Sequence, residues 1–176
     1  DYGSSKQSWP MRRDGALWRA DIPVEGTTAA ITFFVLADDA WDSGVPPSTV
    51  IYGDDGNPVR GSLHTTMDPG NYDKPFEESR RLYPDDYAIY RWRWMMIKYA
   101  KEDAAEAIVE KELKSLLELN QTSPELTYAR CYGWLALSNE PKARALLIEM
   151  LTEHPEAELT ADAASQYDYA AYSNHW

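Results

Sequence analysis

The chain has 176 residues, of which 44% are hydrophobic, and this length accommodates one large domain or two small ones. Its 29 acidic and 17 basic residues give a net charge of −12, which argues against nucleic-acid binding, because a phosphate backbone is bound by clustered positive charge. The single cysteine, Cys131, excludes an internal disulfide framework, and no run of about 18 apolar residues is present to span a membrane. The chain begins at Asp1 without a signal sequence and ends soon after the start of a predicted helix, so we expect it to be a piece of a longer protein.

Residues 1–78 are predicted to form a small antiparallel β-sandwich-like domain. This segment holds seven of the eleven prolines, and short apolar runs alternate in it with turn residues. The predicted strands are residues 17–22, 30–36, 50–52 and 59–66. Residues 54–58, Asp-Asp-Gly-Asn-Pro, predict a tight turn before the last strand, because Asp-Gly readily adopts the positive φ that a hairpin needs.

Residues 79–176 are predicted to form an array of helical hairpins, truncated at the C-terminus, which makes the expected fold class α+β. The first helix is expected to begin near Tyr83, and the second to cover residues 102–119. Ser123, Asn139 and Thr160 are the predicted N-caps of the next three helices. Large apolar side chains spaced by three or four residues are predicted to face inward; they include Tyr87, Tyr90, Trp94, Ile97, Val109, Leu113, Leu117, Leu126, Ala129, Leu147, Met150, Leu151 and Tyr167.

The third and fourth helices carry the pattern of a helical repeat. Ala143, Leu147, Met150 and Pro155 occupy the positions that a tetratricopeptide repeat gives to a small residue, a bulky residue, a second small residue and a proline. Met150 departs from the preference for a small residue, and the distance from Pro124 to Pro155 is 31 residues, against about 34 in that family. The segment therefore resembles a degenerate tetratricopeptide repeat.

A second resemblance covers about residues 11–170. A strand containing Trp18 is followed by the strand at 30–36, an acidic loop at 38–42, the segment 50–61 and a Tyr83-Pro84-Asp85 start to the helices. In this order the elements resemble the region N-terminal to the thioredoxin domain in large bacterial envelope thiol–disulfide oxidoreductases. The resemblance implies a periplasmic or extracellular location. It also implies that the redox domain follows this piece, because the chain itself has no Cys-x-x-Cys.

The chemistry-bearing residues give weak signals, and we expect no catalytic, cofactor-binding or metal site. Cys131 could act as a nucleophile beside a base, but a buried packing position is the favoured interpretation. The three histidines lack a zinc-binding spacing. The acidic segments 38–42 and 54–57 could offer oxygens to calcium, although Asp and Asn also favour turns for local hydrogen-bonding reasons.

Aromatic residues are the better functional lead. Trp18, Trp41 and Trp92 are the candidate binding platform, although for Trp92 packing against the β part is the favoured interpretation. We therefore expect a non-catalytic interaction or scaffold module whose partner is a protein or peptide, including its own downstream domain. The alternative function is a carbohydrate-binding module that uses exposed tryptophans of the β part.

Overall fold

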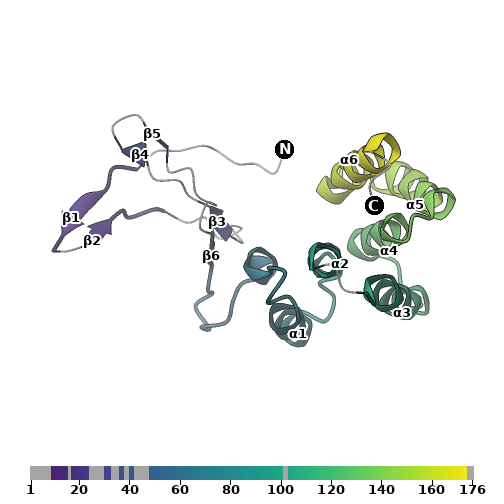
Figure 1. Cartoon of the computed structure of the whole chain (residues 1–176), viewed down its shortest axis with the longest axis horizontal. Coiled ribbons are helices and arrows are strands. Elements are labelled where there is room, and N and C mark those ends of the chain that lie inside the picture. The colour runs from purple at the N-terminus through teal and green to yellow at the C-terminus, as the bar shows by residue number, and fades with distance from the viewer. Residues whose placement is uncertain are drawn as a thin grey trace.

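The computed structural model describes residues 9–15, 17–23, 30–32, 36–37, 40–41, 48–100 and 103–173 (Figure 1). In this part of the chain, six short strands precede a 3₁₀ helix and six α-helices. Figure 1 shows the strands to one side of the molecule and the helices following one another in a row.

The strands form three separate antiparallel pairs. β1 (Arg12–Asp14) pairs with β2 (Leu17–Arg19), β3 (Ala30–Thr32) with β6 (Ser48–Val50), and β4 (Leu36–Ala37) with β5 (Ala40–Trp41). The predicted β-sandwich-like domain is therefore wrong, because no two of these pairs join into a larger sheet within the described ranges. With two or three residues in each strand, a pair has too little apolar area on one face to pack against a second sheet.

The predicted strand at residues 59–66 is also wrong, because its second half is the 3₁₀ helix η1 (Ser62–Thr66). Gly61 begins this helix at a φ of 82°, in the left-handed region that favours glycine. The hydroxyls of Thr65 and Thr66 donate to the backbone oxygens of Ser62 and Leu63, and such local bonds compete with strand pairing. The predicted turn before it is present, with Gly56 at a φ of 74°.

α1 (Asp73–Leu82) was not predicted, and it runs across the predicted domain boundary at residue 78. Pro75 lies in its first turn, where the missing N–H removes no helical hydrogen bond. The buried residues of this helix are Pro75 and Ser79, so the run of large apolar side chains that marks the later helices is missing here.

The five helices predicted after residue 79 are present with shifted ends. They are α2 (Ile89–Tyr99), α3 (Ala105–Leu117), α4 (Pro124–Ala136), α5 (Glu140–Glu153) and α6 (Glu158–Ser173). α2 begins later than predicted because residues 83–88 form turns, in which the Asp86 N–H donates to the Tyr83 carbonyl.

Two of the three predicted N-caps are confirmed. Ser123 Oγ accepts a hydrogen bond from the Leu126 N–H at 3.1 Å, and the Asn139 side chain accepts from the Lys142 N–H at 3.4 Å. Thr160 lies inside α6 instead of capping it, and its hydroxyl donates to the His154 carbonyl at 2.7 Å.

Most predicted inward side chains are buried, but Leu117 and Leu151 are exposed. Leu117 is the last residue of α3, and Leu151 lies in the last turn of α5. Figure 1 shows α2, α4 and α6 on the inner side of the curved row and α1, α3 and α5 on the outer side.

α4 is the central helix, because it contacts α2, α3, α5 and α6. Its buried residues occupy nearly every side of the helix; they are Leu126, Thr127, Tyr128, Ala129, Cys131, Tyr132, Gly133, Leu135 and Ala136. Gly133 permits the close approach of α4 to its neighbours. A Cβ atom at this position would lie 2.8 Å from Leu113 Cδ1 and 2.9 Å from Trp94 Cζ3.

We expect Gly133→Ala to lower the free energy of unfolding by about 1 kcal/mol, because overpacking against the rigid Trp94 ring outweighs the higher helix propensity of alanine. Urea unfolding followed by circular dichroism measures this change. The double variant Gly133→Ala with Leu113→Ala should lose less stability than the sum of the two single variants, since the shortened side chain makes room for the new methyl group. Additive losses, or a more stable Gly133→Ala, would contradict this account of the close approach.

Candidate functional site

The three inner helices are joined by a buried polar network. Arg91 of α2 donates from Nη1 to Asp162 Oδ2 of α6 at 2.7 Å, and the side chains are 12% and 11% exposed. The Tyr128 hydroxyl of α4 donates to the same carboxylate oxygen, and Gln166 Nε2 reaches Asp162 Oδ1 at 3.4 Å. The network therefore connects the first and third inner helices across the second.

Arg91 is also held between aromatic rings. Its guanidinium lies 5.4 Å from the centre of the Trp92 ring and 5.7 Å from that of Tyr132, within cation–π range. Burial raises the pKa of the Tyr132 hydroxyl, and the opposing effect of its hydrogen bond to Arg91 and of the Arg91 charge is smaller. Tyr132 is therefore a neutral hydrogen-bonding group at ordinary pH.

Two exposed tyrosines lie in the helices that this network joins. Tyr99 in α2 is 66% exposed and Tyr169 in α6 is 61% exposed. Asp162, Gln166 and Tyr169 are spaced by four and three residues, so they lie on one side of α6. Tyr99 lies close enough to Tyr132 to act on its pKa. We call Tyr99 and Tyr169 the rim tyrosines, and we call the inner side of α2, α4 and α6 the inner surface (Figure 1).

Of the three predicted platform residues, Trp92 contacts the polar network, because its ring lies beside the Arg91 guanidinium. It is half-buried, and its ring centre lies 6.5 Å from that of His64 in η1 at an interplanar angle of 35°. The side chains of Trp18 and Trp41 lie outside the described residues; their backbones pair with Arg13 in β1 and Leu36 in β4.

Sequence reasoning missed the central ion pair, because its partners are 71 residues apart. No local pattern connects an arginine in one helix with an aspartate two hairpins later. One sequence pattern could have indicated this region. Asp162, Gln166 and Tyr169 are spaced along one side of a helix whose opposite side is apolar.

A second polar cluster contains His64, Ser79 and Asp86. His64 Nε2 lies 2.9 Å from Asp86 Oδ2, and Ser79 Oγ donates to the same oxygen at 3.0 Å. Burial acts to raise the pKa of Asp86, but the hydrogen bonds from His64 and Ser79 and the charges of His64 and Arg60 together lower it below its ordinary value. The serine donates to the carboxylate and not to the imidazole. Asp86 therefore links His64 of η1 to Ser79 of α1, which is a structural role. A nucleophile would instead need a hydrogen bond to the imidazole.

Cys131 is buried, as predicted, and its thiol lies 3.4 Å from the Ala143 carbonyl of α5. Burial raises the pKa of this thiol to about 12. Since the thiolate is the reactive form, Cys131 is a poor nucleophile in the native state.

Among the described residues, no group of three or more His, Cys, Asp or Glu side chains could hold a metal ion. In the acidic turn, Asp55 is engaged by its neighbour: its Oδ1 accepts from the Asn57 N–H at 3.0 Å and its Oδ2 from the Asn57 side chain at 3.0 Å. Asp38, Asp39 and Asp42 of the other acidic segment lie outside the described residues.

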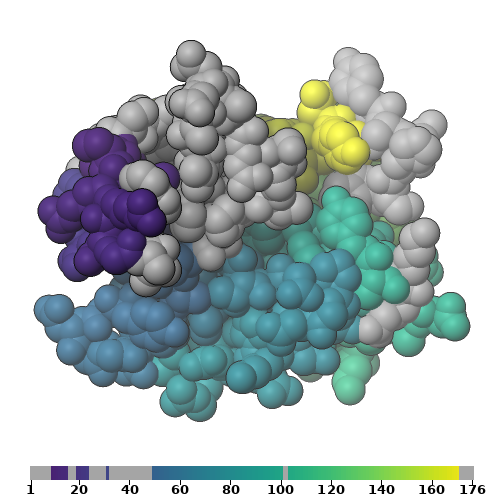
Figure 2. All heavy atoms as spheres, turned by 60° about the vertical axis from the view of Figure 1, so that its left-hand side comes forward, coloured from purple at the N-terminus to yellow at the C-terminus, as the bar shows by residue number. Residues whose placement is uncertain are grey.

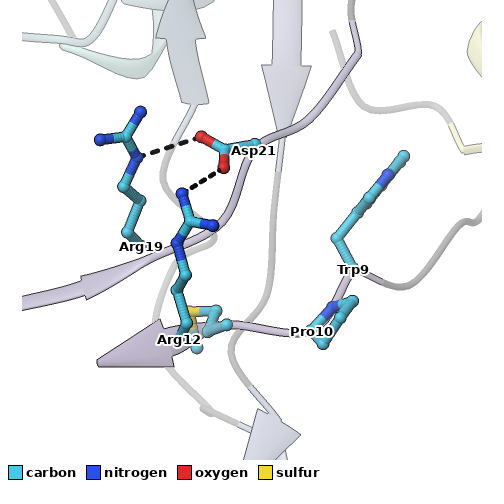
Figure 3. Close-up of a pocket in the computed structure, with 6 residues that line it drawn as sticks. Trp9, Pro10, Arg12, Arg19 and Asp21 are labelled. Atoms are coloured by element: carbon cyan, nitrogen blue, oxygen red, sulfur yellow. Dashed lines mark hydrogen bonds and ion pairs between the residues drawn. The ribbon is translucent and has the colours of Figure 1, made fainter. Parts of the chain in front are cut away.

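An open pocket lies beside the β1–β2 hairpin. It has a volume of about 280 Å³ and is lined by Trp9, Pro10, Met11, Arg12, Arg19 and Asp21. Figure 3 shows Trp9 across from the two arginines, which both contact Asp21. Their nitrogens lie 2.8 Å and 3.0 Å from the two carboxylate oxygens.

Comparison with known proteins gives no relative: no family model, curated protein or solved structure matches the chain. Each helix in the described ranges is too short or too polar to cross a bilayer.

We expect Cys131 to react with iodoacetamide at pH 8 about a thousandfold more slowly in the native state than in urea, because a pKa of about 12 instead of the ordinary 9.0 leaves far less thiolate. Mass spectrometry of quenched samples measures the two rates. The native state keeps the proton of the Cys131 thiol to a higher pH than the unfolded state does. This difference contributes to the free energy of unfolding; the contribution is complete below pH 9 and is lost as the pH rises from 9 toward 12. Rapid native alkylation would show that the thiol is accessible and ionised.

We expect Asp162→Asn to lower the free energy of unfolding by about 3 kcal/mol, because it leaves the Arg91 charge buried without its counter-ion. The matched control is Asp85→Asn, which breaks the Arg60–Asp85 pair, where the aspartate side chain is 70% exposed. That control should lose less than about 1 kcal/mol, as exposed ion pairs do. Equal losses in urea unfolding would show that the buried pair does not hold α2 to α6.

Proposed function

We propose that this chain is a non-catalytic interaction module that binds a protein or peptide through the inner surface of its helical row. The observation that carries the proposal is the pair of rim tyrosines, which are exposed on two helices that the Arg91–Asp162 pair holds together. Tyrosine contributes a large, stiff contact area with a hydroxyl at its tip, and it is enriched among the residues that dominate binding energy.

Rigidity of the surface supports the same proposal. α4 is buried on nearly all sides, and the ion pair connects the helices on either side of it, so the two tyrosines are held on a fixed frame. A frame that does not need to be ordered on binding loses less conformational entropy when the partner arrives. A peptide lying across α2, α4 and α6 would contact both tyrosines.

The parent protein and the location of the chain follow only from the resemblance of its sequence. We propose that the module precedes a thioredoxin-like redox domain in a bacterial envelope protein. Sequencing the gene to its end checks this proposal, since a Cys-x-x-Cys domain should follow Trp176. The alternative carbohydrate-binding function rests on Trp18 and Trp41, and their side chains lie outside the described residues.

Selection of a random peptide library displayed on phage is expected to enrich a motif on the wild-type chain. The double variant Tyr99→Ser with Tyr169→Ser should lose binding to the enriched peptides by about a hundredfold, since hot-spot residues contribute 2 kcal/mol or more when truncated. Binding of the synthetic peptides is measured by fluorescence anisotropy.

The matched control is Tyr52→Ser, because Tyr52 is 62% exposed and lies outside the helices. It should leave peptide affinity unchanged. If the selection enriches no motif, or if Tyr52→Ser weakens binding as much as the double variant, the inner surface is not the binding site.

A further inference from the structure

The β1–β2 hairpin carries an unfavourable pairing that the fold alone does not explain. Arg12 and Arg19 stand directly opposite each other in the ladder, and like charges in opposed cross-strand positions destabilise a strand pair. Asp21 lies between them and contacts both. One carboxylate shared by two guanidinium groups leaves a local positive charge in a chain whose net charge is −12.

The two arginines keep hydrogen-bonding capacity for a ligand. Arg12 uses Nη2 and Arg19 uses Nε toward Asp21, whereas a guanidinium group carries five N–H donors. Their side chains are 68% and 58% exposed. Two guanidinium groups held in place by an aspartate are suited to a planar oxyanion such as a carboxylate, which can accept parallel hydrogen bonds.

The pocket also has an apolar lining. Trp9, Pro10 and Met11 contribute the apolar part of the lining, and Figure 3 shows the Trp9 ring across the opening from Arg12. An indole ring offers a flat surface for a ligand ring. A volume of about 280 Å³ lies just below the usual range for ligand pockets and suits a single ring with one substituent.

We propose that this pocket binds a small organic carboxylate carried on a ring, with the carboxylate at Arg12 and Arg19 and the ring against Trp9. Figure 2 shows the hairpin, in purple, at one edge of the visible surface. The negative net charge of the chain does not prevent this binding. At 0.1 M salt, charges more than about 10 Å away are largely screened, so the nearby guanidinium groups dominate the electrostatic attraction of the carboxylate. The proposal is independent of the inner surface of the helices.

Titration of the ¹⁵N-labelled full chain, followed by NMR chemical shifts, tests the proposal with three probes. Glucuronate and benzoate carry a carboxylate on a sugar ring and on an aromatic ring, and glucose is the neutral counterpart of glucuronate. We expect saturable shifts of the Trp9 indole resonance, assigned with Trp9→Phe, for at least one of the two acids, and no saturation with glucose. Binding of only one acid assigns the ring type.

Arg12→Gln and Arg19→Gln should each weaken binding of the acid about tenfold, since each removes charge-assisted hydrogen bonds. Arg13→Gln is the matched control: Arg13 is an exposed arginine in the same strand whose Nε contacts the Gly15 carbonyl, and it does not line the pocket. Far-ultraviolet circular dichroism confirms that the variants keep the helices. Saturation by neither acid, equal saturation by glucose, or a loss in Arg13→Gln as large as in the pocket variants would each overturn the proposal.

Discussion

The arrangement of the helices depends on how closely α4 approaches its neighbours. Gly133 is the point of closest approach, where the space that a side chain would occupy is filled by Leu113 of α3 and the ring of Trp94 of α2. Trp94 is itself fully buried, and its indole N–H donates to Glu112 Oε2 of α3 at 2.7 Å. The same small residue therefore brings α2 and α3 together on one side of α4. The other side carries Cys131, which packs against α5.

This packing also brings together the polar network of the inner helices. With α2 and α6 drawn against α4, Arg91 and Asp162 meet above Tyr128 and Tyr132. The Tyr128 hydroxyl and the Gln166 amide donate to Asp162, and the rings of Trp92 and Tyr132 lie within cation–π range of the Arg91 guanidinium. The ion pair joins α2 to α6, so the exposed tyrosines in these two helices are held relative to each other.

Local sequence patterns predicted the helices better than the strands or the surface. Two of the capping signals are short sequence patterns, namely Ser123 followed by Pro124 and Asn139 followed by Pro141. In the structure both side chains accept the expected N-cap hydrogen bond. Thr160 has a side chain suited to an N-cap, but its hydroxyl donates to the His154 carbonyl in the preceding turn. The sandwich was predicted from strand-like composition, yet strand pairing depends on partners distant in sequence, and the strands are too short to stack. The Arg91–Asp162 pair could not be predicted because it joins α2 and α6, which are separated by three other helices in the sequence.

The same pair changes how the row of helices comes apart. In a linear array where each hairpin touches only its neighbours, the terminal helix frays independently, and stability is a sum of local terms. Here α6 is bonded to α2, with the α3–α4 hairpin between them in the sequence, so that opening of α6 exposes the charge on Arg91 as well as its own apolar side. We therefore expect local opening of α6 to be coupled to α2, with α2, α4 and α6 opening as one cooperative unit. The surface they share exists only when all three are in place.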